Sequence, residues 1–143
     1  MMMSVLPLVL ERRAKRGANT YATIRLQLEH LTTHHDVRLL ALSDANGLVL
    51  ASSGTREHAE ALAAYSPVLG ACVDPGRWSE LREAVARHMP LEASAQILVR
   101  PFFVDGQRLY LSVVGSRAAA LEAALYRALA GMRCIFRQNL GDL

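Results

Sequence analysis

Apolar residues recur along this chain at spacings typical of regular secondary structure. In residues 20–34, Ile24, Leu28 and Leu31 lie at positions i, i+4 and i+7, which places them on one face of an α-helix. Leu26 widens that apolar face. We therefore predict an amphipathic helix over residues 20–34.

Two apolar runs then form the first predicted β-hairpin. They cover residues 37–42 and 47–51, and Asn46-Gly47 lies between them. Asn and Gly tolerate the positive φ angles that tight hairpin turns require. Both runs are apolar at successive positions, as in strands that are covered on both faces. We expect both strands in the middle of a sheet.

A second hairpin is predicted over residues 95–104 and 108–115, with Asp105-Gly106 at the turn. Residues 109–114 alternate well between two faces. Pro101 lies in the middle of the preceding run, where it has no N–H to donate to a neighbouring strand. Residues 95–104 should therefore form an edge strand, or a strand that is bulged at Pro101.

Between the hairpins, a helix is predicted to begin near Arg56, with Ser53 or Thr55 as its N-cap. Pro67 is expected to kink or end it. Its small and apolar residues share one face: Ala59, Leu62, Ala63 and Ser66. Such a face allows close approach of another element, which suits either a dimer interface or packing on the chain's own sheet.

Two more helices are expected after a turn at Asp74-Pro75-Gly76. The first covers residues 78–88, and the second is a long helix over residues 117–139 with Ser116 as its cap. The apolar positions of helix 78–88 and its end are Trp78, Leu81, Val85 and Met89.

The order of these elements predicts the fold class. Hairpins rather than single strands separate the helices, so we expect an α+β fold with an antiparallel sheet of four or five strands and helices on both faces. A length of 143 residues with 52% hydrophobic and 20% charged residues is typical of one domain. We assign it to residues 21–143, after an N-terminal arm of residues 1–20.

Composition limits the classes of function. No apolar stretch is long enough to span a membrane, and the apolar residues 5–10 precede the basic cluster of residues 11–16, the wrong order for a secretory signal. Cys72 and Cys134 are too few and too distant for a disulfide framework or a zinc knuckle. The net charge of +3 is dispersed, unlike a nucleic-acid footprint. These features predict a cytoplasmic protein without nucleic-acid binding.

Candidate chemistry is sparse. His30 and His34 lie one helical turn apart and could chelate a metal, or could complement the helix dipole, and no cysteine or carboxylate completes the site at the expected spacing. No serine stands in a G-x-S-x-G turn. The nucleophile candidates are Ser52, Ser53, Ser66, Cys72 and Cys134. We therefore predict a protein without catalytic residues, cofactor or metal.

Two segments resemble the Roadblock/LC7 domain family. Leu42-Ser43-Asp44-Ala45-Asn46-Gly47-Leu48-Val49-Leu50-Ala51-Ser52-Ser53-Gly54 is similar to the family's first strand, D-x-x-G turn and second strand, and residues 57–64 fit the helix that follows. Residues 105–115 resemble a later hairpin of the family. The resemblance extends over about residues 22–139. This chain departs from the family pattern in two ways. It has an extra predicted helix at 78–88, and no fifth strand is predicted before the last helix. Either that strand is lost, or Val5–Leu10 substitutes for it.

The resemblance implies a non-catalytic homodimer that scaffolds or regulates a Ras-like small GTPase or a signalling complex. Carried over to this chain, it implies a dimer contact through the second helix and a sheet edge. The residues concerned are Ala59, Leu62, Ala63, Ser66, Leu98, Arg100 and Phe102. The alternative is a GAF-like ligand-sensing domain, which would require an enclosed pocket between sheet and helices.

Overall fold

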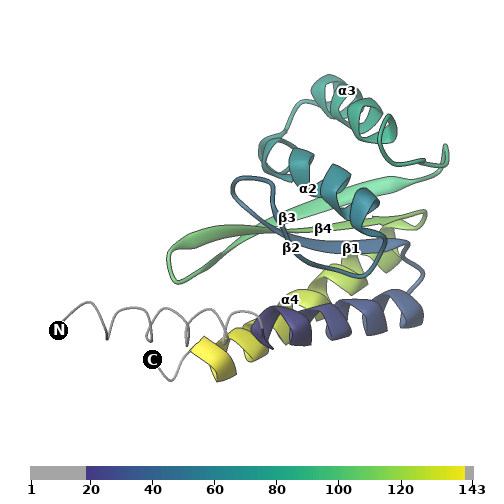
Figure 1. The fold of residues 1–143 in the computed structure, drawn as a ribbon. Helices are drawn as coiled ribbons and strands as arrows, with labels where there is room; N and C mark the ends of the chain where they lie inside the picture. Colours follow the sequence, from purple (N-terminus) through teal and green to yellow (C-terminus); the bar gives the residue numbers. More distant parts are fainter. Residues whose placement is uncertain (1–18, 141–143) are drawn as a thin grey trace.

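The computed structural model describes residues 19–140 and shows three layers: helices, a sheet, and helices again (Figure 1). The proposed strand Val5–Leu10 lies outside the described residues. The elements are helix 19–34, β1 (Leu39–Asp44), β2 (Val49–Ser52), α2 (Arg56–Ala71), α3 (Pro75–Ala86), β3 (Gln96–Val104), β4 (Gln107–Gly115) and α4 (Ala118–Leu140). The order of helices and strands is the one that the sequence predicts.

The described part of the chain holds one antiparallel sheet of four strands in the order β2-β1-β4-β3. Helix 19–34 and α4 cover one face of this sheet, and α2 covers the other, with α3 beyond it (Figure 1). The predicted α+β class, with helices on both faces, is confirmed.

Alternation of side chains along the central strands supplies both cores. In β1, Leu40 and Leu42 point into the core beneath helix 19–34 and α4, whereas Leu39 and Ala41 point into the core beneath α2. Successive side chains of a strand point to opposite faces, so four consecutive apolar residues are buried in two different places. This is why β1 has no polar face.

The second hairpin forms as predicted. Asp105 and Gly106 have φ angles of 50° and 77°, which are the two positive φ angles of a type I′ turn. The register of β3 and β4 is unbroken from Gln96 opposite Gly115 to Val104 opposite Gln107. Pro101 therefore lies in an edge strand that is not bulged.

One expectation about the first hairpin is wrong. β1 is central, but β2 is an edge strand and is only partly buried. The irregularity in the sheet also lies here, between Leu42 and Ser43 opposite β2. An apolar run indicates that both faces of a strand are covered. It does not indicate whether another strand lies on each side of it in the sheet.

Helix α2 continues through Pro67 instead of ending there. Thr55 occupies the N-cap position but makes no side-chain cap, and Ser53 bonds the backbone N–H of Leu40 in β1 through its Oγ (2.9 Å). The serine and threonine before α2 therefore do not cap this helix with their side chains.

The boundaries of the last two helices also differ from the prediction. Asp74-Pro75-Gly76 starts α3 instead of forming a separate turn: Asp74 Oδ1 accepts from Gly76 N at 3.0 Å, and Pro75 is the first helical residue. An N-cap acid followed by proline is a helix start signal. In α4 the first helical residue is Ala118, and Leu121 N donates to Arg117 O, so Ser116 lies one residue before the cap position.

Candidate functional site

The described residues hold no group of three or more His, Cys, Asp or Glu side chains that could bind a metal. The rings of His30 and His34 lie next to each other, with centroids 4.1 Å apart and planes tilted by 51°, as their spacing of one turn predicts. Cys72 is partly buried and Cys134 is exposed. From residue 19 to residue 140, no helix is long and apolar enough to cross a membrane.

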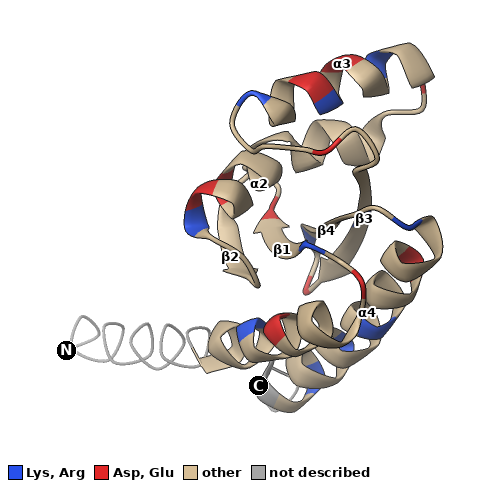
Figure 2. Cartoon of the chain, turned by 90° about the vertical axis from the view of Figure 1, so that its right-hand side faces the viewer, with Lys and Arg blue, Asp and Glu red and all other residues tan. Residues whose placement is uncertain are grey.

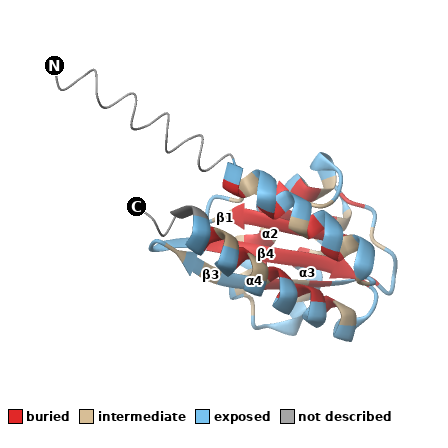
Figure 3. Ribbon diagram, turned by 90° about the horizontal axis from the view of Figure 1, so that it is seen from below, coloured by how far each residue is buried: buried red, intermediate tan, exposed pale blue. Residues whose placement is uncertain are grey.

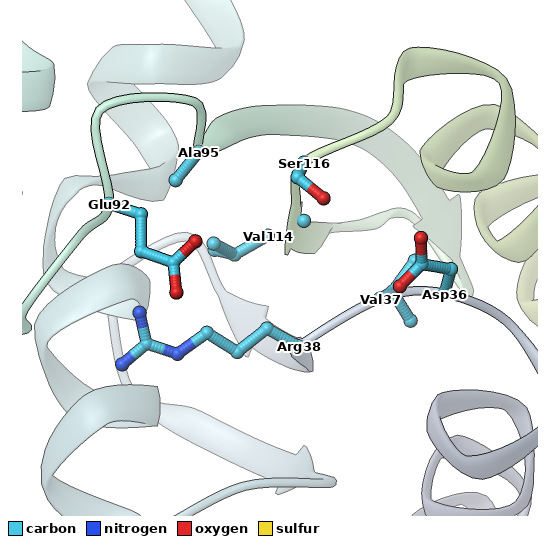
Figure 4. Close-up of a pocket in the computed structure, with 8 residues that line it drawn as sticks. Asp36, Val37, Arg38, Glu92, Ala95, Val114 and Ser116 are labelled. Atoms are coloured by element: carbon cyan, nitrogen blue, oxygen red, sulfur yellow. The ribbon is translucent and has the colours of Figure 1, made fainter.

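A pocket of about 310 Å³ opens where β1 begins and β4 ends. Figure 4 shows the side chains of Arg38 and Glu92 pointing toward each other there, with Asp36 farther along the rim. Arg38 also donates a hydrogen bond to the carbonyl of Pro90, so its guanidinium ties the loop before β3 to β1. This pocket lies at an end of the sheet, whereas a GAF-like ligand site would lie between sheet and helices.

The outer edge of β3 is a more informative feature. Backbone groups of a strand alternate between its two neighbours. Ser53 N donates to Leu40 O, so even-numbered residues of β1 face β2 and odd-numbered residues face β4. The odd-numbered residues of β1 pair with even-numbered residues of β4, so the odd-numbered residues of β4 direct their backbone groups to β3. Those residues pair with even-numbered residues of β3, whose backbone groups therefore face β4. The odd-numbered residues, 97 to 103, direct their backbone groups to the edge.

Pro101 is one of those odd-numbered residues. Its missing N–H therefore removes nothing from the ladder between β3 and β4, where the register is continuous. The N–H groups of Ile97, Val99 and Phe103 and the carbonyls of all four residues remain on the edge. Pro101 thus leaves a gap in the donors available to any strand that pairs there.

Three of the candidate interface residues lie in β3 and share a face. Leu98 and Phe102 are half-buried against the core beneath α4, and Arg100 between them is exposed. On the other face, Phe103 is 63% exposed and the Arg108 guanidinium lies 5.2 Å from its ring centroid. Sequence reasoning missed Phe103, although alternation from Phe102 places it on the opposite face.

The four candidates in α2 are Ala59, Leu62, Ala63 and Ser66, and all are fully buried against the chain's own sheet. The missing side chain of Gly47 lets the first hairpin approach the backbone of α2 closely, since a Cβ added there would lie 3.2 Å from the Ala63 carbonyl oxygen. The sequence left two roles open for this face of α2, a dimer interface or packing on the chain's own sheet. In the structure these side chains pack on the sheet. A partner would meet the opposite face of α2.

That opposite face is shallowly hollowed. A depression of about 500 Å³ is lined by Glu57, Glu60, Ala61, Ala64, Tyr65 and His88. Glu60 accepts from Arg56 at 2.8 Å, so one carboxylate is paired within the helix. Of the residues that line this depression, Tyr65 is of a type that is enriched at protein interfaces.

Tyr21 is a partly buried tyrosine of helix 19–34. Burial raises the pKa of its phenol above the ordinary value of 10.0, and the nearby Asp44 carboxylate raises the pKa further. The Tyr21 ring meets Phe136 edge to face, with centroids 6.3 Å apart. Tyr21 thus helps to attach helix 19–34 to α4, and nothing in its surroundings suits acid–base chemistry near neutral pH.

The sequence matches no protein-family model, and a search of curated proteins found no relative. Among solved structures, the fold is similar to that of Myxococcus xanthus MglB, with a TM-score of 0.53 and 18% sequence identity. The match covers 82% of this chain and 90% of MglB. The chain has a Roadblock/LC7-like fold.

This Roadblock/LC7-like fold carries the departures that the sequence indicates. The described residues include four strands, and α3 lies where the extra helix is predicted. The edge of β3 and the outer face of α2 lie in the region where the resemblance implies a dimer contact.

Proposed function

We propose that this chain is a non-catalytic regulator or scaffold of a Ras-like small GTPase or of a signalling complex, and that it acts as a homodimer in the cytoplasm. One observation carries the proposal: its Roadblock/LC7-like fold is shared, over 82% of the chain, with MglB, a small-GTPase regulator. Fold similarity by itself is an analogy, so the proposal depends on a direct binding test.

The dimer we propose joins two β3 edges and the adjoining outer faces of α2. The β3 edge offers backbone groups at the four odd-numbered positions, with Phe103 exposed beside them. Ala59, Leu62, Ala63 and Ser66 hold α2 in place from within, and Leu98 and Phe102 do the same for β3 from the other face. Arg100 is the one of the seven candidates whose side chain is exposed.

Pro101 weakens the strand pairing in that dimer. In a symmetric antiparallel pair, a register that places Pro101 opposite Pro101 leaves both residues without a donor, so neither inter-strand hydrogen bond of that pair can form. A register that offsets the two prolines loses one bond at each of two separate pairs. Either register loses two hydrogen bonds, so Pro101 weakens the ladder without selecting between the two registers.

The test has two parts. Light scattering after gel filtration gives the mass of the full chain, and we expect twice the 15.7 kDa monomer at micromolar concentration. Ras-like GTPases from the same genome, loaded with GDP or with a non-hydrolysable GTP analogue, are then titrated by calorimetry. We expect one of them to bind in a nucleotide-dependent manner. A Tyr65→Glu variant on the outer face of α2, within the proposed dimer contact, should shift the chain toward the monomer.

A monomer would refute the dimer, and no binding by any GTPase in either nucleotide state would refute the regulatory role. Glu92→Gln, at the rim of the sheet-end pocket away from both surfaces, serves as the control variant.

A further inference from the structure

A second hollow surface lies on the opposite face of the sheet from α2. Helix 19–34 and α4 run over that face together (Figure 3), and a groove of about 670 Å³ lies between them. It is lined by Gln27, His30 and Leu31 from one helix and by Ala123, Tyr126, Arg127 and Ala130 from the other. We call it the α4 groove.

The shape of the α4 groove suits a helix. Ala123 and Ala130 lie two turns apart on α4 and contribute only methyl groups, so the floor stays low between them. Tyr126, 76% exposed, lies between these alanines in the sequence, and Leu26 on the other helix is 60% exposed. Amphipathic helices bind in such grooves through residues spaced by three and four.

The side chain of Gln27 in this groove is only weakly held. Its Nε2 donates to the carbonyl of Arg127 across a long 3.4 Å, and its Oε1 is buried without a partner among the described residues. It can lie over α4 because residue 131 is glycine, where a Cβ would collide with the amide. Because Oε1 is buried, a donor from a bound chain reaches it only when the weakly held amide turns outward.

Charge distinguishes this surface from the opposite one. Helix α4 carries Arg127, Arg133 and Arg137 against Glu122, a balance of +2, whereas α2 and α3 together carry three arginines and four glutamates, a balance of −1. Figure 2 shows the basic positions distributed along α4. The ion pairs of the described chain join Arg25 to Glu29, Arg56 to Glu60 and Arg77 to Glu80, so the α4 arginines have no carboxylate partner there.

We propose that the α4 groove binds an amphipathic helix of a partner protein, one that presents small apolar residues flanked by acidic side chains. A second copy of this chain would place arginines against arginines. The chain's own residues 11–16 carry four basic residues and one acidic residue, so they are repelled as well. An anionic bilayer shares the charge preference, but it is flat and cannot fill a groove between two helices.

This site does not depend on the proposed GTPase role, because α2 lies on the other side of the sheet (Figure 1). A partner bound in the α4 groove leaves α2 and the β3 edge free for the dimer contact. A dimer formed through those surfaces would keep both of its α4 grooves accessible, which is what a scaffold requires.

The probes are two synthetic peptides of about 20 residues that share a Leu/Ala face at positions i, i+3, i+4 and i+7. One carries Glu on the flanking positions and the other carries Lys. Fluorescence anisotropy with the full chain gives their affinities, and amide chemical shifts of the ¹⁵N-labelled chain locate them. We expect the Glu peptide to bind at least about tenfold more tightly at low salt, with shifts in residues 26–34 and 119–134.

Two variants test the role of the arginines and of the groove floor. Arg127→Glu/Arg133→Glu should weaken the Glu peptide about tenfold or more and strengthen the Lys peptide. Ala130→Trp should fill the groove and weaken the Glu peptide without changing the charge. Arg77→Glu on α3 is the matched control and should leave both affinities unchanged. All of these positions are exposed, and circular dichroism checks that each variant is folded.

Three outcomes would overturn the proposal: equal affinity for the two peptides, amide shifts that map to α2 or β3, or unchanged binding in the Ala130→Trp variant. A further arm measures sedimentation of the chain with vesicles that hold about 30% phosphatidylserine. Arginine-dependent binding to vesicles without binding of the Glu peptide would assign the surface to a membrane instead.

Discussion

Two buried hydroxyls show how single residues position α2. Ser66 Oγ bonds the Leu62 carbonyl at 2.8 Å and lies 2.6 Å from Ser112 Oγ of β4. Both serines are fully buried in a layer that is otherwise apolar. If Ser66 donates to Leu62, Ser112 must donate to Ser66, so the two residues form a short chain of hydrogen bonds from β4 into the helix.

This arrangement predicts unequal costs for the two deletions. Ser66→Ala leaves the Ser112 hydroxyl buried without a partner and should lower the free energy of unfolding by about 1–3 kcal/mol. Ser112→Ala leaves Ser66 bonded to Leu62 and should cost about 0.5–1.5 kcal/mol. Urea denaturation of both single variants and the double variant measures the difference. A larger loss for Ser112→Ala would contradict the assigned direction of the bonds.

A second prediction at this scale concerns pH and Tyr21. Its pKa is raised in the folded chain, so the folded state holds the phenolic proton more tightly than the unfolded state does. The resulting stability is fully present below the unfolded pKa of 10.0 and is lost as the pH rises through the folded pKa. Thermal unfolding between neutral pH and pH 11 should therefore show a steeper alkaline loss for the wild type than for Tyr21→Phe, and parallel curves would contradict it.

At the scale of elements, the sheet has two edges of different character. β2 has four residues and is partly buried, whereas β3 has nine and pairs with β4 along its whole length. Long exposed edges invite pairing with other chains, and natural proteins interrupt them with proline or charge. Pro101 and Arg100 both lie in the middle of β3. The edge can therefore pair with another strand, but it lacks one donor and carries one positive charge at its centre.

Pro101→Ala would restore one N–H to that edge. If two β3 strands pair in the dimer, each partner gains a donor, and two hydrogen bonds worth about 0.5–1.5 kcal/mol each should lower the dimer Kd roughly 5- to 150-fold. Sedimentation equilibrium measures this constant. Glu122→Ala is the control, because Glu122 is exposed on α4, which covers a face of the sheet away from the β3 edge. An unchanged Kd for Pro101→Ala would exclude strand pairing at this edge.

At the scale of the whole molecule, one sheet joins two cores. Leu62 lies in the core beneath α2 and Leu121 in the core beneath α4, and both are fully buried. β1 and β4 contribute residues to both cores. Unfolding of either helical layer would therefore expose one apolar face of the same two strands whose other face the remaining layer covers. The chain should therefore unfold as one cooperative unit.

Leu62→Ala and Leu121→Ala test this coupling. Each should lower the free energy of unfolding by about 2–5 kcal/mol, and each should shift the whole transition while leaving it single. Far-ultraviolet circular dichroism reports the helices, and the fluorescence of Trp78 in α3 reports the α2 side. Divergence of the two signals in either variant would show that the layers unfold separately.

Much of this structure follows from local signals in the sequence. The turn at Asp105-Gly106 was predictable because few residue types accept two successive positive φ angles. The helix of residues 20–34 was predictable because its apolar residues recur every three or four positions. Asp74 and Pro75 carried a helix start signal as well, although the same residues also occur in turns, and only the helix that follows decides between the two.

The candidate site was less predictable. The sequence identified α2 and the strand of residues 96–104, but it could not say which face of each would remain exposed. Ala59, Leu62, Ala63 and Ser66 form one face by periodicity alone, whether a sheet or a partner covers it. Phe103 was missed because exposure of an aromatic residue depends on where the covering helix ends.

By itself, the sequence determined the order of elements, the antiparallel hairpins, the turn at Asp105-Gly106 and the absence of a recognisable catalytic motif, since each of these depends on residues close together in the chain. Only the tertiary structure decided that β2 and β3 are the edges, that the backbone of Pro101 faces away from β4, and that Arg127 of α4 lines a groove on the face of the sheet opposite α2. These features depend on which distant segments lie side by side, and local periodicity carries no information about that choice.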